Sequence, residues 1–143
     1  MKQSTRRFVL TTAVLCLGLA PAAVAAETIK RPTAASEVWV RTELYFGTNK
    51  SNNQQVTEAE FTSFVDAQVT SRFPDGLTLL TGYGQFRTSA GILVREKSYL
   101  LILFYPPQLQ DANKKIHEIR ESYKSAFSQE SVLRVDGYSF VSF

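Results

Sequence analysis

One apolar segment, Tyr99–Tyr105 (YLLILFY), constrains the fold of this chain more than any other stretch. It has the length of a strand and is apolar at odd and even positions alike, so we expect a central strand that is apolar on both faces. Two prolines follow directly and end it, because proline cannot donate a hydrogen bond to a sheet. Upstream, the Pro74–Gly76 turn and the segment Leu77–Arg87 predict an antiparallel neighbour. The hairpin from Phe73 to Tyr105 is therefore expected to organise the chain.

Two features of this hairpin need interpretation. The segment Thr88–Lys97 contains Gly91 and several charged residues, and is either the end of the hairpin or an irregular start of the apolar strand. Gly82 and Gly84 share one face of the first strand, and such a pair predicts close packing of a helix or an aromatic ring.

A strand and a helix are predicted before the hairpin. Val38–Phe46 alternates between apolar and mixed residues, which is typical of a strand with one core face. A polar loop follows over residues 47–55. Thr57 and Glu60 then form a capping-box pattern, and apolar residues recur every three or four positions. An amphipathic helix over Glu58–Phe73 is the prediction.

Another helix and strand are predicted after the hairpin. Apolar residues at helical spacing mark Gln110–Phe127, and Val132–Phe143 has the character of a last strand in which Asp136 and Gly137 indicate a bulge. The order strand, helix, strand, strand, helix, strand, with right-handed crossovers, predicts a ferredoxin-like α+β sandwich. Two helices would cover one face of a four-stranded antiparallel sheet and leave the other face open.

The N-terminal stretch, residues 1–25, has the layout of a secretory signal peptide. Three basic residues precede an apolar run over Phe8–Ala20, and Pro21 and a small-residue end follow the run. The run is too short for a permanent membrane span. Cleavage is expected near Ala25 or Ala26. The paired arginines fit the general secretory route and the twin-arginine route alike.

This assignment sets the expected domains and location. A flexible lead is predicted over residues 26–37 and one folded domain over residues 38–143. The mature protein would then be exported to the periplasm or the exterior of a bacterium.

Charge and cysteine content narrow the classes of partner. The chain has 16 Lys plus Arg and 13 Asp plus Glu, and removal of residues 1–25 takes three basic residues and leaves 13 of each. A formally neutral domain lacks the uncompensated basic cluster that nucleic acid requires, so no nucleic-acid partner is expected. Cys16, the one cysteine, falls in the predicted signal, and Leu15 before it argues against lipid anchoring. The mature chain would have no thiol for disulfides, catalysis or metal binding.

Several blocks of the sequence resemble a known family. They are RTELYFG over 41–47, VTEAEF over 56–61, RFPDGLTLL over 72–80, GYGQFR over 82–87, REKS over 95–98 and SVLRV over 131–135. In this order they resemble the domain-of-unknown-function 3574 family of short exported bacterial proteins, over about Val38–Phe143. Phe86 departs from the pattern, where tryptophan is expected. The resemblance implies the domain extent and export. It brings no established activity, so no catalytic residue is carried over.

The open sheet face is the best candidate for a site. The first strand places Trp39, Arg41, Glu43 and Tyr45 on it, and we expect the other strands to add Tyr83, Gln85, Arg87, Tyr99, Tyr105, Arg134 and Asp136. Guanidinium and amide groups between aromatic side chains can orient a small polar or anionic ligand. The candidate ligand-binding residues are Arg41, Glu43, Tyr45, Tyr83, Gln85 and Arg87.

The same face can instead be a solvated or dimer-forming surface, on which Arg–Glu pairs and tyrosines pack across the strands. Leucines on an open face favour a cover, whether a partner subunit or a terminal segment. The candidate interface residues are Trp39, Tyr99, Leu101 and Leu103.

Catalytic signatures are weak. His117, the one histidine, lies off the apolar stripe of its helix and is expected to be exposed, so no Ser–His–Asp triad is predicted. A carboxylate pair would have to combine Glu43 with Glu96 or Asp136, on proximity alone. No metal-ligand spacing appears, so neither a metal nor a cofactor is expected, and the catalytic residues stay unassigned.

Two hypotheses of function follow. In the first, the chain is a cofactor-free binding or interaction domain that forms a homodimer through its open sheet face. In the second, it is a small cofactor-independent enzyme with a pocket for a polar or anionic substrate on that face.

Overall fold

The computed structural model describes residues 35–50, 54–87 and 90–143. The predicted signal peptide with its cleavage site, and most of the predicted lead over residues 26–37, lie outside the described residues. Those predictions therefore stay predictions. In the described part, no helix is long and apolar enough to cross a membrane.

The elements follow the predicted order. They are β1 Glu37–Gly47, α1 Glu58–Phe64, β2 Thr78–Arg87, β3 Leu93–Tyr105, α2 Ala112–Phe127 and β4 Leu133–Val141. A π-helical segment, Val65–Thr70, continues α1. For the segment Thr88–Lys97, the sequence left open a hairpin end or the start of a strand. Because β3 begins at Leu93, the second half of this segment belongs to the strand.

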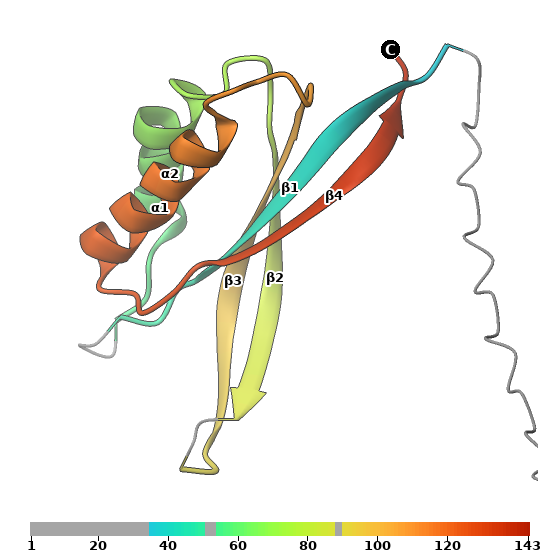
Figure 1. Cartoon of the computed structure of the whole chain (residues 1–143). Coiled ribbons are helices and arrows are strands. Elements are labelled where there is room, and N and C mark those ends of the chain that lie inside the picture. Colours follow the sequence, from blue (N-terminus) through green and yellow to red (C-terminus); the bar gives the residue numbers. More distant parts are fainter. Residues whose placement is uncertain (1–34, 51–53, 88–89) are drawn as a thin grey trace, which may run out of the picture. The chain divides into compact units, whose positions relative to one another are not determined.

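The strands form one sheet in the order β2-β3-β1-β4, and every neighbouring pair is antiparallel. Helices α1 and α2 both lie on one face of this sheet (Figure 1). The ferredoxin-like α+β arrangement expected from the sequence is confirmed. We call the face under the helices the helix side and the opposite face the open face; no described helix covers the open face.

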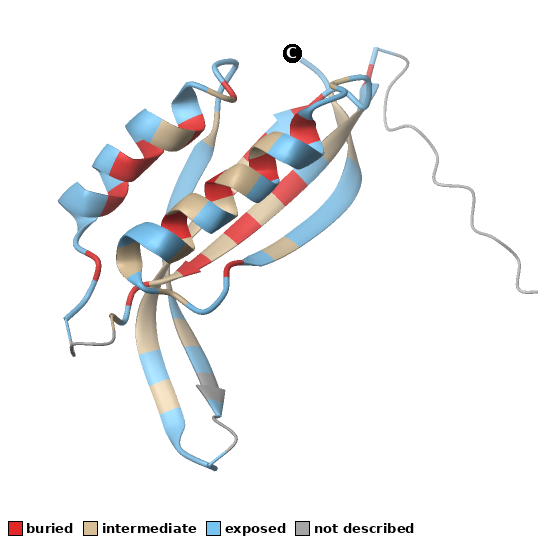
Figure 2. Ribbon diagram, turned by 60° about the vertical axis from the view of Figure 1, so that its left-hand side comes forward, coloured by how far each residue is buried: buried red, intermediate tan, exposed pale blue. Residues whose placement is uncertain are grey.

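Strand register assigns side chains to the two faces, because directly opposed residues of an antiparallel pair point the same way. Val40, Thr42, Leu44 and Phe46 of β1 stand opposite Tyr105, Leu103, Leu101 and Tyr99 of β3. From Thr42 on, both rows are fully or almost fully buried on the helix side. Figure 2 shows the buried positions of the helices turned toward the sheet.

Aromatic side chains dominate this core. The Phe46 ring packs edge-on against Tyr123 of α2, with 4.6 Å between ring centroids. Phe61 of α1 stacks on Tyr99 at 4.1 Å. The buried Tyr123 hydroxyl donates to the carbonyl oxygen of Gly47 at 2.8 Å, and burial raises its pKa. One ring cluster therefore fixes both helices to the central strands.

The predicted capping box at the start of α1 is present. The Thr57 hydroxyl accepts from the amide of Glu60 at 3.2 Å, and the Glu60 carboxylate accepts from the amide of Thr57 at 2.8 Å. Lys50 also donates to Glu60 at 2.7 Å. This bond, followed by those from Thr57, lowers the pKa of Glu60 to about 2.

Two local predictions are wrong. Among the described residues, a Cβ atom at Gly82 or Gly84 would meet only Ser98 and Glu96 of the neighbouring strand, at 3.6 and 3.9 Å, so no described helix or ring packs there. Asp136 and Gly137 stay in unbroken register with Thr42 and Arg41, so β4 has no bulge at that point.

Candidate functional site

The open face is built around alternate residues of β1. Trp39, Arg41, Glu43 and Tyr45 share it, as predicted, because Thr42, Leu44 and Phe46 between them are buried on the helix side. Glu43 lies opposite Ile102 of β3 and Val135 of β4. The centre of this face is therefore one polar strand between two apolar ones.

Arg41, Glu43 and Tyr45 form a continuous polar cluster. The Arg41 guanidinium forms an ion pair with one carboxylate oxygen of Glu43. The Tyr45 hydroxyl donates to the other, and this hydrogen bond raises the pKa of Tyr45. The two opposite charges cancel. The cluster can hold its own side chains in place, and it presents no net charge to a partner.

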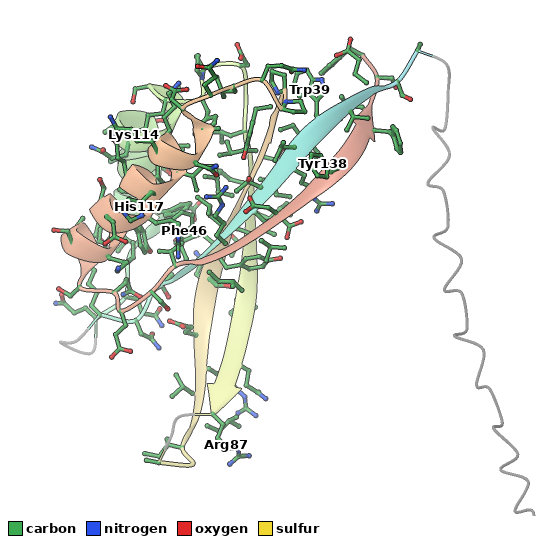
Figure 3. The ribbon with its side chains drawn as sticks, viewed as in Figure 1. Trp39, Phe46, Arg87, Lys114, His117 and Tyr138 are labelled. Carbon is green, nitrogen blue, oxygen red and sulfur yellow. The ribbon has the colours of Figure 1, made fainter. Side chains whose placement is uncertain are left out.

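Trp39 extends the row toward the end of β1. Its indole Nε1 donates to Glu37 at 3.0 Å, and its ring lies tilted against Phe143 with 5.3 Å between centroids. Figure 3 shows Trp39 at one end of the sheet and Arg87 at the far end of the β2–β3 hairpin.

Tyr83, Gln85 and Arg87 do not join this cluster, and their predicted placement is wrong. Their partners in β3 are Lys97, Arg95 and Leu93, which follow the parity of the buried Tyr99 and therefore point to the helix side. Gln85 accepts from Arg95 Nε at 2.8 Å, and Arg87 donates to the carbonyl oxygen of Gly91 at 2.9 Å. Three of the six predicted ligand-binding residues thus lie on the opposite face of the sheet from the other three.

Tyr99, Leu101 and Leu103 are also misplaced by the sequence interpretation. They were expected on the open face, but all three are buried under the helices, Leu101 and Leu103 completely. Tyr105 is buried with them. The open-face residues of β3 are the alternate set Leu100, Ile102 and Phe104, opposite Tyr45, Glu43 and Arg41. An apolar strand gives no contrast between its faces, so its parity could not be read from the sequence.

Arg134 and Asp136 of β4 lie on the helix side as well, because they stand opposite the buried Leu44 and Thr42. The open face of β4 instead presents Leu133 and Val135, which the sequence analysis did not assign to it. Their exposed fractions are 59% and 45%.

The candidate carboxylate pairs are separated. Glu43 and Asp136 lie on opposite faces of the sheet. Glu96 is occupied, because its carboxylate accepts from the backbone amides of Thr48 and Asn49, both at 3.0 Å. It anchors the loop after β1, and the structure gives it no partner for glycoside chemistry.

His117 is exposed on α2, as expected. Among the described residues, no group of three or more His, Cys, Asp or Glu side chains could hold a metal ion. The polar cluster on β1 offers hydrogen bonding and a paired charge, and the residues around it offer apolar surface.

Comparison with known proteins places the chain in a family. The model of DUF3574, a protein of unknown function, matches residues 41–143. A search of curated proteins found no match.

Solved structures share the fold. A phage SAM lyase in complex with S-methyl-5'-thioadenosine has a TM-score of 0.57 at 14% identity, over 81% of this chain and 96% of that chain. A phage SAM lyase in the apo state has a TM-score of 0.53 at 16% identity, over 81% and 97%. CutA from Synechococcus elongatus has a TM-score of 0.47 at 12% identity, over 74% and 79%. At 14% and 16% identity, the likeness to the two lyase structures shows the fold alone.

Proposed function

This chain belongs to the DUF3574 family of proteins of unknown function, and we propose that it is an exported interaction module that pairs with a second copy of itself through the open face. Export is inferred from residues 1–25, whose basic start, apolar run and small-residue end have the layout of a signal peptide.

The orientation of β4 carries the proposal. In an antiparallel sheet with one solvated face, apolar side chains point to the core and polar ones point to water. The first half of β4 reverses this rule: Arg134 and Asp136 point to the helix side, and Leu133 and Val135 point away from it. A strand with this pattern is stabilised when its outer face is covered.

Beyond the polar row of β1, strands β3 and β2 present further apolar side chains on the open face. Leu80 of β2 is 51% exposed, and Phe104 of β3 is also exposed. Between them lie the half-buried Leu100 and Ile102. Large uncovered apolar areas on a small domain are typical of interaction surfaces.

Size and charge favour a second copy as the partner. Four strands about 4.8 Å apart and roughly 30 Å long present on the order of 600 Å² of sheet surface, close to the ~800 Å² that each partner buries in a standard interface. Arg41 and Glu43 cancel at the centre of the face, so two copies meet without like-charge repulsion.

A matched pair of variants tests the proposal. Leu80 and Leu79 are adjacent and exposed in β2 and point to opposite faces. We expect the mature protein to sediment as a dimer, Leu80→Glu to sediment as a monomer because a charge would be buried in the interface, and Leu79→Glu to remain dimeric. A monomeric wild type at about 100 µM, or a dimeric Leu80→Glu, would contradict the proposal.

The enzyme hypothesis receives less support. The six candidate ligand-binding residues are divided between the two faces, and only Arg41, Glu43 and Tyr45 remain together. These three satisfy one another, so no observation favours a substrate pocket among them.

A further inference from the structure

A cavity lies on the helix side of the sheet, apart from the open face. Its volume is about 410 Å³, and it is bounded by β1, β4, the end of β3 and the beginning of α2. Small-molecule sites typically begin at about 300 Å³. Tyr138 of β4 forms one wall and is labelled in Figure 3.

A hydrogen-bond chain runs from the core to this cavity. The Thr42 hydroxyl, fully buried, donates to Asp136 Oδ1 at 2.6 Å. It lies 2.9 Å from the Tyr105 hydroxyl. A threonine hydroxyl has one hydrogen, so Tyr105 must be the donor to Thr42. The Thr42 hydroxyl therefore holds the Asp136 carboxylate on the core side, and the Tyr105 hydroxyl in turn holds Thr42.

Arg134 fixes the same carboxylate from the side. Its Nε lies 3.0 Å from Oδ1 and 2.9 Å from Oδ2 of Asp136, and its terminal nitrogen donates to Asn113 Oδ1 of α2 at 2.7 Å. The Arg134 side chain is only 19% exposed, whereas that of Asp136 is 45% exposed. The pair is rigidly placed, with a carboxylate accessible at the cavity.

Both groups retain bonding capacity. Each carboxylate oxygen can accept two hydrogen bonds, so Oδ2 of Asp136 can accept another donor. A guanidinium has five N–H donors, and these contacts use two of them. A carboxylate and a guanidinium side by side match a ligand that carries an ammonium group and a carboxylate on one carbon atom.

We propose that this cavity binds a small zwitterion of the α-amino-acid class with an apolar side chain. Asp136 would accept from the ligand's ammonium group and Arg134 would donate to its carboxylate, in charge-assisted hydrogen bonds. The apolar part of the ligand would lie against Leu109, Pro107 and Tyr138. The site neither requires nor excludes pairing of the open faces, because it lies on the other side of the sheet.

Three probe compounds test the ligand class on the mature protein by titration calorimetry. L-Phenylalanine carries both charges, phenethylamine lacks the carboxylate and 3-phenylpropionate lacks the ammonium group. We expect phenylalanine to bind, and each analogue to bind about tenfold more weakly or worse. No binding of phenylalanine up to about 10 mM, or equal binding of all three compounds, would overturn the proposal.

Two variants locate the site. Asp136→Asn keeps the shape and an acceptor for Thr42 but removes the charge, and Tyr138→Ala removes an exposed wall without touching the core. We expect each to weaken phenylalanine binding by about tenfold. Asp75→Asn, in the exposed turn before β2, is the matched control and should bind as the wild type does. Unchanged binding in both site variants would refute this location.

Discussion

The two faces of the sheet use the same strands in opposite ways. On the helix side, Leu44, Phe46, Leu101 and Leu103 are completely buried beneath α1 and α2, and an aromatic cluster joins them. On the open face, apolar side chains of three strands surround a polar row on β1 and remain partly or largely exposed.

This difference separates the face that stabilises the domain from the face that is available to a partner. The helix side contains the hydrophobic core of the domain, because buried residues of the sheet and of both helices form one cluster there. Nothing within the described residues requires Leu133 and Val135 to be apolar. Their character is accounted for if the outer face of β4 is covered by a second copy.

The largest expected effect is a difference in stability between variants at two adjacent residues of β3. Leu103→Ala should lower the free energy of unfolding by about 2–5 kcal/mol, because it opens a cavity in a closed core. Ile102→Ala, on the open face, should cost about 1 kcal/mol or less in the monomer. Urea denaturation at low protein concentration measures both. Similar losses for the two variants would refute the division into a packed and an open face.

A smaller effect is expected from two tyrosine hydroxyls. Tyr123→Phe removes a buried donor and leaves the carbonyl oxygen of Gly47 without its bond, which should cost about 1–3 kcal/mol. Tyr45→Phe removes a hydrogen bond to Glu43 on the open face and should cost less. Thermal unfolding of both variants gives the order, and a reversed order would contradict the assigned burial.

The smallest expected effect is on the stability of the fold at acidic pH. The folded-state pKa of Glu60 is about 2, below its ordinary value of 4.5, so the unfolded chain binds a proton first as the pH falls. The stability that Glu60 contributes is therefore complete above about pH 4.5 and is lost toward pH 2. Glu60→Gln should flatten the dependence of the unfolding midpoint on pH over this window. An unchanged slope would show that the contacts of Glu60 with Lys50 and Thr57 do not stabilise the fold.

The sequence predicted the fold because several local signals agreed. The alternation of β1 assigned Trp39, Arg41, Glu43 and Tyr45 correctly to one face, and the capping box placed the start of α1. Element order together with crossover handedness then left few topologies.

The candidate site was predicted only in part, for a physical reason. Apolar residues occupy both parities of β3, so periodicity could not tell Leu101 from Ile102, and an error of one residue reverses every side chain. In the first half of β4, Arg134 and Asp136 point to the helix side, against the usual alternation. In both strands, the pairing register determines which side chains point to which face, and the register depends on residues that are distant in the sequence.

Burial of the open face itself is the most direct test of the account. If the signal is removed the mature chain has no cysteine, so Leu80→Cys and Leu79→Cys each introduce one thiol on one face of β2. We predict that the labelling rate of the Leu80→Cys thiol by a maleimide falls as the protein concentration is raised through dimerisation, while that of Leu79→Cys stays constant. Labelling rates that are independent of concentration in both variants would contradict the pairing of open faces.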